Sequence, residues 1–445
     1  MSRRAAMAEA VSEIAVVAGL SEQGQGIVRE GKTAFVAGAL PGETIRFRRV
    51  RRHRQYDEAR LEAVLSSAST RVAPRCAHFD ICGGCALQHL ESRAQLALKQ
   101  QQLAETLQRL ARLEPLRWLE AISSRPWSYR RRARLGVKYV RRKGRVLVGF
   151  RERASHFVAD LERCEVLAEP IGSLIAPLAA LIGRLSVREQ LPQVEVAVGD
   201  RTAALVLRVL AAPIEQDLGL LREFEARHAV RIYLQSGGPA TVCALTEPQQ
   251  PLSYALPESD LELEFGPSDF IQINAEANRA LVAAAGTLLE LTGAARVLDL
   301  YCGLGNFSLA LARRAGSVVG IEAEAALVER ARNNARRNGI INAQFFQADL
   351  SGSDLAGAAW LRAPYSHVLL DPPRAGARDM LAQIAQLAPQ RLLYVSCHPG
   401  TLARDLGVLV HEHGFELLAA GVVDMFAHTA HVESVALLRP QRSAQ

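Results

Sequence analysis

Apolar residues alternate with polar ones in short runs over the first 65 positions, and glycine turns separate the runs. Thr44-Ile45-Arg46-Phe47-Arg48 shows the pattern most clearly, with an apolar side chain at every second position. A period of two is typical of half-buried strands. The turns near Gly24, Gly31 and Gly42 leave room for short strands only. We therefore expect a small five-stranded barrel of the oligonucleotide-binding type over residues 1–70.

The next stretch, residues 71–268, is expected to form a central domain that mixes strands with helices. Leucines at 96, 103, 107 and 110 recur at spacings of seven, four and three, which predicts a helix over 91–113 with these side chains on one side. This helix could pack on its sequence neighbours or on the C-terminal domain. The apolar run 171–182 is broken by Arg184 well before the ~18 apolar residues of a membrane span, so we expect a core helix and no membrane association.

In the third stretch, residues 269–445, apolar strand patterns alternate with helical ones. Strands are expected at 297–300, 317–321, 344–346, 367–370 and 392–395. This alternation predicts an α/β domain with a parallel, doubly wound sheet. Such sheets bind ligands at the carboxyl ends of their strands. The fold class is therefore multidomain: a β-barrel, a central α+β domain and a C-terminal α/β domain.

Composition agrees with a globular protein of several domains. The chain has 445 residues, of which 49% are apolar and 22% charged. Its seven cysteines, an odd number, do not resemble a disulfide framework, and we expect a reducing cytoplasm.

The net charge of +7 is concentrated in two arginine-rich segments, residues 46–54 and 125–145. Trp127, Tyr129 and Tyr139 lie within the second. Guanidinium groups bind phosphates and stack on bases, as aromatic rings do, so the mixture favours RNA with unstacked nucleotides. The alternative is a solvated basic face.

A turn at residues 301–307 follows the first strand of the C-terminal domain, and its glycines would let the backbone approach a nucleotide. Glu322, at the end of the second strand, is placed to accept hydrogen bonds from ribose hydroxyls. Asp349 and Asp371 follow the third and fourth strands. Carboxylates around the pocket suit the sulfonium of S-adenosylmethionine better than a dinucleotide pyrophosphate. For Asp349 an ordinary helix cap remains the alternative.

Cys397 enters a turn after the last strand pattern, and Glu433 follows in His431-Val432-Glu433. Carbon 5 of uracil is a poor nucleophile until another group adds to carbon 6, and a thiolate suits that addition. A base must then remove the C5 proton, for which Glu433 is the candidate. A buried, inert thiol is the alternative for Cys397.

Cys76, Cys82 and Cys85 lie close together in the chain, and Cys164 lies much farther along. Four thiolates suit either a [4Fe-4S] cluster or tetrahedral zinc, and the sequence does not separate them.

Taken together, these motifs resemble those of the RNA (uracil-5)-methyltransferase family, specifically the 23S ribosomal RNA branch with an N-terminal TRAM domain. The similarity runs almost end to end. The motifs are Phe270-x-Gln272-x-Asn274, the 299–307 loop, Asp371-Pro372-Pro373-Arg374, Ser396-Cys397-His398-Pro399 and His431-Val432-Glu433. One departure is Tyr301, where some relatives have phenylalanine.

The resemblance implies roles for individual residues. Cys397 would be the nucleophile and Glu433 the base. The four cysteines would hold a [4Fe-4S] cluster, and no protein partner is implied. The residues expected around S-adenosylmethionine are Gln272, Tyr301, Asn306, Glu322, Asp349 and Asp371.

The implied substrate is a single-stranded or loop uridine of 23S ribosomal RNA, flipped out of its stack. Two alternatives stay open: the same enzyme acting on cytosine or on transfer RNA, and an iron-sulfur protein that binds RNA or senses redox state. The sequence does not indicate which uridine is modified.

Overall fold

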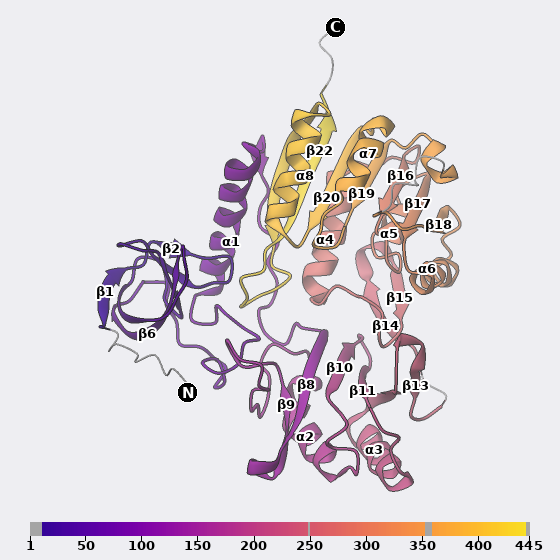
Figure 1. Ribbon diagram of the computed structural model, residues 1–445. Helices are drawn as coiled ribbons and strands as arrows, with labels where there is room; N and C mark the ends of the chain where they lie inside the picture. The colour runs from indigo at the N-terminus through magenta and orange to yellow at the C-terminus, as the bar shows by residue number, and fades with distance from the viewer. Residues whose placement is uncertain (1–10, 248–249, 352–357, 442–445) are drawn as a thin grey trace, which may run out of the picture. The chain divides into compact units, whose positions relative to one another are not determined.

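The computed structural model describes residues 11–247, 250–351 and 358–441, and the chain divides into two compact units (Figure 1). The first comprises Met1–Leu98 with Glu152–Ser155 and Ala427–His431. The second comprises Lys99–Arg151, His156–Phe426 and Val432–Gln445. No helix among the described residues is long and apolar enough to cross a bilayer.

A six-stranded sheet fills the first unit up to residue 66, in the order β1-β5-β6-β4-β3-β2. Ile45 and Phe47 are fully buried while Arg46 between them is exposed, as the alternation predicts. The expected strand number of five was wrong, because a two-residue strand pairs separately with β3. The strands are β1 (Glu13–Val16), β2 (Gly19–Leu20), β3 (Gly26–Val28), β4 (Ala34–Ala37), β5 (Thr44–Arg52) and β6 (Asp57–Ser66).

Part of the first arginine cluster is neutralised inside this sheet. Arg49 lies between Glu13 and Asp57, at 2.8 and 2.9 Å, and Arg48 pairs with Glu62 at 2.7 Å. These arginines therefore contribute less free positive charge than the sequence alone indicates.

Helix α1 (Ser92–Thr106) continues into a π-helical turn, Leu107–Ala111. Leu103 and Leu107 are fully buried, but Leu110 is 55% exposed. The prediction that all four leucines share one side was wrong at Leu110, because the wider π turn changes the angular spacing. The turn packs on helix α8 (Pro399–His411), where Nε2 of His411 lies 2.8 Å from the carbonyl oxygen of Ala111.

A second six-stranded sheet, order β13-β12-β11-β10-β8-β9, opens the larger unit, with α2 (Ile175–Arg184) and α3 (Glu215–His228) beside it (Figure 1). On β8 (Arg132–Val140), Leu135 and Val137 are buried while Arg134 and Lys138 are exposed, so these two basic side chains lie on the opposite face of the strand from the apolar pair. The other strands are β9 (Arg145–Gly149), β10 (Gln193–Val198), β11 (Ala203–Arg208), β12 (Val230–Gln235) and β13 (Val242–Ala244). A hairpin of β14 (Leu252–Leu256) and β15 (Leu261–Phe265) follows.

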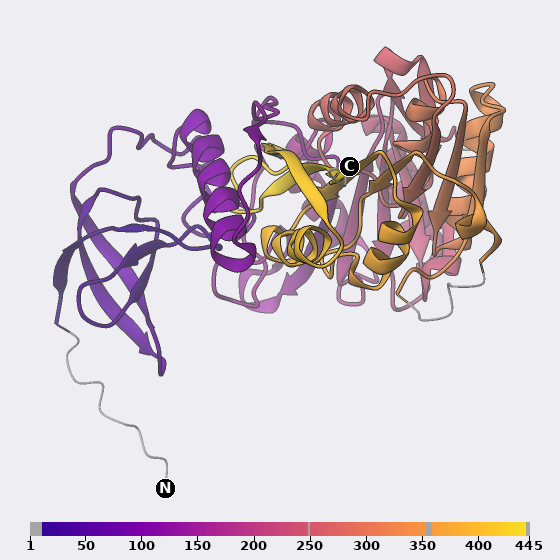
Figure 2. The ribbon, with the colours of Figure 1, turned by 90° about the horizontal axis from the view of Figure 1, so that it is seen from above.

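The C-terminal domain is an eight-stranded sheet, order β18-β17-β16-β19-β20-β22-β21-β7, with helices on both faces (Figures 1 and 2). The five predicted strands form its parallel part, which confirms the α/β reading. They are β16 (Arg296–Leu300), β17 (Ser317–Glu322), β18 (Ala343–Gln347), β19 (His367–Leu370) and β20 (Arg391–Ser396). The helices are α4 (Ala275–Leu288), α5 (Ser308–Ala312), α6 (Ala325–Arg337), α7 (Leu381–Leu387) and α8.

The last two strands, β21 (Phe415–Val423) and β22 (Glu433–Pro440), form an antiparallel hairpin, with β22 against β20. The two-residue strand β7 (Arg117–Trp118) closes the edge beside β21. β22 thus runs opposite to β20, and its first residue comes to the edge where the parallel strands end.

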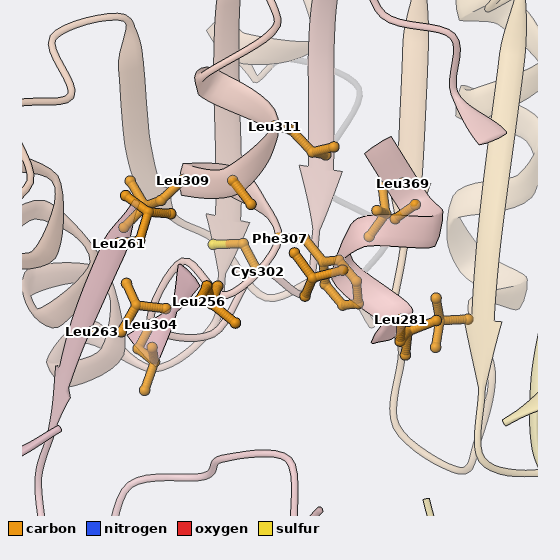
Figure 3. Packing of buried hydrophobic residues seen from close by; sticks show 14 of the residues in the cluster. Leu256, Leu261, Leu263, Leu281, Cys302, Leu304, Phe307, Leu309, Leu311 and Leu369 are labelled. Carbon is orange, nitrogen blue, oxygen red and sulfur yellow. The ribbon is translucent and has the colours of Figure 1, made fainter. Parts of the chain in front are cut away.

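The main core of the larger unit lies directly beneath the predicted nucleotide loop. Figure 3 shows Cys302, Leu304 and Phe307 of that loop packed among leucines of β14, β15, α4 and α5. Close packing of this kind restricts side-chain movement. The loop is therefore a rigid part of the fold.

Candidate active site

The loop after β16 turns sharply because several of its residues have left-handed backbone conformations. Tyr301 has φ 65°, Gly303 φ 56° and Gly305 φ 94°. For tyrosine this region is sterically costly, and such strain is concentrated at functional sites. The turn brings the Gly303 amide to the Glu322 carboxylate at 3.1 Å, and Glu324 donates to the other Glu322 oxygen at 3.0 Å. Glu322 is therefore fixed beside the loop, with lone pairs left to accept from hydroxyl groups.

Asn306 lies in the same loop, but its amide is engaged within the protein. It exchanges two hydrogen bonds of 2.9 Å with the amide of Asn278 on α4. Its oxygen also accepts from the Tyr254 hydroxyl at 2.9 Å. In this arrangement Asn306 joins the loop to α4 and β14.

Asp349 is exposed beyond the end of β18, the strand next to β17. Its carboxylate accepts hydrogen bonds from the Ser351 amide at 2.9 Å and the Ser351 hydroxyl at 2.6 Å, which lower the pKa of Asp349. Asp349 thus stays ionised at the same sheet edge as Glu322. The residues that would decide between a helix cap and a ligand, 352–357, lie outside the described part.

Asp299 belongs to this site, although no role was predicted for it. It is fully buried near the end of β16, and one oxygen accepts a 2.5 Å hydrogen bond from Ser308. Its other oxygen has no hydrogen-bond partner among the described residues. Burial, opposed by Ser308 and helped by the negative charge of Asp371, raises the pKa of Asp299 to about 7. A buried carboxyl with an unused oxygen is typical of a ligand site.

Asp371 follows β19, which pairs with β16, so the two strand ends lie side by side. The Gln272 amide donates to the Asp371 carboxylate at 3.1 Å. Burial nevertheless raises the pKa of Asp371 to about 7. The structure thus brings together two predicted site residues that lie 99 positions apart in the chain.

Cys397 and Glu433 lie at the end of the β20–β22 ladder. Ser396 pairs with Ser434 in antiparallel register, so Cys397, the next residue, and Glu433, the preceding one, are opposite each other. Opposed residues of an antiparallel pair have Cα atoms about 4.5–5.5 Å apart. The register alone therefore puts the thiol and the carboxyl within reach of one ligand.

The electrostatics connect these groups with Asp371. Glu433 is 3% exposed, and burial together with the Asp371 charge raises the pKa of Glu433 well above its usual range. The Cys397 thiol is half-buried; burial and then Glu433 raise its pKa, while the guanidinium of Arg374 acts in the opposite direction. Perturbed groups clustered at one edge of a sheet mark a candidate active site.

The cysteine-rich turn lies in the first compact unit and Cys164 in the second. The Gly84 amide donates to the Cys82 sulfur at 3.4 Å, and Arg153 donates to the carbonyl oxygens of Cys82 and Cys85 at 3.2 and 2.8 Å. Over the ranges that the structure describes, no three His, Cys, Asp or Glu side chains converge as metal ligands do.

Comparison with known proteins identifies the family. Residues 91–441 match the model described as tRNA (Uracil-5-)-methyltransferase. The chain belongs to this family. This confirms the resemblance seen in the motifs.

Three curated relatives carry the same name, 23S rRNA (uracil(1939)-C(5))-methyltransferase RlmD. The protein from Alkalilimnicola ehrlichii is 50% identical over 97% of both chains. Those from Xylella fastidiosa and Nitrosospira multiformis are 48% and 45% identical, covering 94% and 96% of this chain and 95% and 98% of the relatives.

A solved structure shows the same fold at lower identity. It is the Pyrococcus abyssi tRNA (uracil-54, C5)-methyltransferase in complex with S-adenosyl-L-homocysteine. The TM-score is 0.74 at 23% identity, with 96% of this chain and all of that chain covered. The α/β methyltransferase part of the predicted fold is thereby confirmed, in a chain that forms more than one compact unit.

Proposed function

We propose that this family member transfers a methyl group from S-adenosylmethionine to C5 of a uridine in 23S ribosomal RNA, through a covalent adduct between Cys397 and C6. The observation that carries the proposal is the β20–β22 register, which sets Cys397 and Glu433 opposite each other at the ligand-binding edge of the sheet. The ribosomal substrate is supported by relatives of 45–50% identity over nearly the whole chain.

The cofactor residues are proposed from their place at the strand ends. Glu322 is positioned to accept from ribose hydroxyls, and Asp349 and Asp371 supply negative charge for a sulfonium. Tyr301, Gln272 and Asn306 complete the proposed set. S-adenosylmethionine, when bound here, supplies an electrophilic methyl group. Asp299, whose pKa is raised by burial and by the nearby charges of Asp371 and Glu322, is proposed to offer its unpaired oxygen to the same ligand.

The reaction follows from the chemistry of two side chains. The Cys397 thiolate would add to C6, and the π electron pair of the C5–C6 double bond would form the bond from C5 to the methyl carbon. The bond between that carbon and the sulfonium sulfur would break, and S-adenosylhomocysteine would leave with its electron pair. Glu433 next takes the proton from C5, and the electrons left behind expel the thiolate. A buried carboxylate with a raised pKa is a stronger base than an exposed one, which suits the second step.

The remaining predictions concern the rest of the chain. We propose that residues 1–70 form a TRAM-type RNA-binding barrel, that 71–268 form the central domain and that 269–445 form the catalytic domain. Cys76, Cys82, Cys85 and Cys164 are proposed ligands of a [4Fe-4S] cluster. The amide bonded to the Cys82 sulfur and the adjacent Arg153 suit anionic thiolates. Bound iron and a visible absorption band would decide for the cluster, and bound zinc against it.

The direct test is a methylation assay on 23S ribosomal RNA from cells that lack the modification. Labelled S-adenosylmethionine and mass-spectrometric mapping should place one methyl group on C5 of one uridine. Undermodified transfer RNA is the second arm, because the matched family model and the solved neighbour are both named for transfer RNA. If only transfer RNA is labelled, the substrate is transfer RNA and not ribosomal RNA. If neither RNA is labelled, the proposed methyltransferase function is rejected.

A further inference from the structure

A cavity of about 310 Å³ lies within the larger compact unit, at the junction of the central sheet and helix α4. Small-molecule sites begin near this volume, so the cavity can hold one base or nucleotide. Its lining includes Trp127, Tyr129, Arg131, Asp200, Asn274 and Arg279. None of these residues belongs to the proposed methyl-transfer machinery.

The cavity is joined to the candidate active site through the backbone. The Arg131 amide donates to the Ile273 carbonyl oxygen at 2.8 Å. Ile273 lies between Asn274, which lines the cavity, and Gln272, which holds Asp371. Two residues of extended chain span roughly 7 Å. A ligand in the cavity would therefore be a near neighbour of a base held beside Asp371.

Two guanidinium groups are held in place at the cavity by a single carboxylate. Asp200 forms an ion pair with Arg131 through one oxygen, and its other oxygen accepts from Arg279 at 2.9 Å and from the Ala255 amide at 2.8 Å. Over the whole lining, Arg125, Arg131 and Arg279 face an equal number of carboxylates, on Glu169, Asp200 and Glu276. Positive charge is therefore in excess only locally, where the single Asp200 carboxylate faces Arg131 and Arg279. Planar guanidinium groups fixed in this way can stack on bases and bind phosphates.

The aromatic wall is formed by a strained turn. Ser128, between Trp127 and Tyr129, has φ 52°, and its amide donates to the Glu165 carbonyl oxygen at 2.9 Å. A left-handed serine is disfavoured, and such strain persists where the surrounding structure enforces it. The turn places two aromatic residues, separated by Ser128, on the lining of one cavity. Aromatic rings beside arginines are typical of single-stranded nucleic acid sites.

We propose that this cavity binds a second nucleotide of the RNA, adjacent to the target uridine, with its base stacked on Trp127 and its phosphate held by Arg131 and Arg279. The inference rests on the proposed function for the identity of the strand. Trp127 would then help to select the substrate, because the enzyme would bind an unstacked nucleotide next to the target uridine as well as the target base itself. A uridine inside a regular stack would then be a poor substrate.

The test measures RNA binding in the Cys397→Ala background, so that it does not depend on turnover. An RNA loop containing the target uridine is made in versions with an abasic site at each flanking position. Each version is titrated with the protein carrying Trp127, Trp127→Ala or Trp118→Ala. Trp118 is a matched control, since it lies on the edge strand β7 and does not line the cavity.

We expect one flanking abasic site to weaken binding about tenfold when Trp127 is present. Trp127→Ala should weaken binding of the intact RNA by a similar factor and remove the penalty at that abasic position, while Trp118→Ala should change neither. An unchanged penalty in Trp127→Ala, or no penalty at any flanking position, would overturn the inference. Methylation of the intact RNA by the wild-type enzyme is measured separately. If the enzyme methylates this RNA but the abasic penalty is absent or does not depend on Trp127, the inference fails and the proposed function stands. If the penalty depends on Trp127 but the enzyme does not methylate the RNA, only the proposed function fails.

Discussion

The Tyr394 hydroxyl donates a 2.7 Å hydrogen bond to the Asp405 carboxylate, and both side chains are fully buried. The same Asp405 oxygen accepts from the Ala377 amide at 2.8 Å. Arg404, bound to the other oxygen at 2.8 Å, donates to the Ala375 carbonyl oxygen at 2.7 Å. This network fastens the loop that follows Asp371 to helix α8, and the helix begins just after Cys397.

The first prediction concerns Gly376, at the centre of that network. Its φ of 83° disfavours any other residue, and an added Cβ would overlap Asp405 and Arg404. We expect Gly376→Ala to lower the free energy of unfolding by roughly 2–4 kcal/mol. Gly414 is the matched control, because its φ is 67° but an added Cβ would meet nothing within 4 Å. Thermal melts should therefore show a clearly larger loss for Gly376→Ala; equal losses would mean that the overlap contributes nothing.

The second prediction concerns the reactivity of Cys397. Arg374 lowers the pKa of the thiol against the effects of burial and Glu433. Removing this cation in Arg374→Gln should raise that pKa further, so alkylation of Cys397 at neutral pH should slow about threefold to tenfold. The rate is measured by mass spectrometry of the Cys397 peptide, with exposed Cys243 as the internal control. If the Cys397 pH profile does not move, Arg374 does not act on the thiol.

The third prediction uses the pH dependence of stability. The pKa of Asp299 is about 7 in the folded protein, above its ordinary value near 4, so the folded state holds this proton more tightly than the unfolded state. Asp299 therefore lowers the free energy of unfolding by an amount that grows as the pH rises from about 4 to about 7. Above pH 7 this loss of stability stays at its full size. Asp299→Asn, which can still accept from Ser308, should stabilise the cofactor-free protein by on the order of 2–4 kcal/mol at pH 8 and by little at pH 4. A difference that does not depend on pH would contradict this.

The parallel strands were predictable because each is a short apolar run between helical patterns, and β16 to β20 lie where those runs are. The carboxylates after the strands were predictable for the same reason, since strand ends share one edge of the sheet. Glu322 and Asp371 lie there as expected.

Contacts between side chains that are far apart in the sequence could not be predicted from the periodicity of apolar residues. Asn306 lies in the expected loop, but Asn278 and Tyr254, which engage its amide, come from α4 and β14. The burial of Asp299 depends on packing around β16 and α5 that periodicity does not contain. The π turn after α1 likewise exposed Leu110, because only tertiary structure reveals a change of helical pitch.

The measurement that tests the mechanism most directly is the trapping of the protein on RNA. With Glu433→Gln, the C5 proton cannot be removed, so the adduct through Cys397 should accumulate in the presence of S-adenosylmethionine. A denaturing gel should then show a shifted protein–RNA band for Glu433→Gln and none for Glu433→Gln with Cys397→Ala. The account is contradicted if the double variant still gives the band, or if Cys397→Ala alone keeps normal turnover.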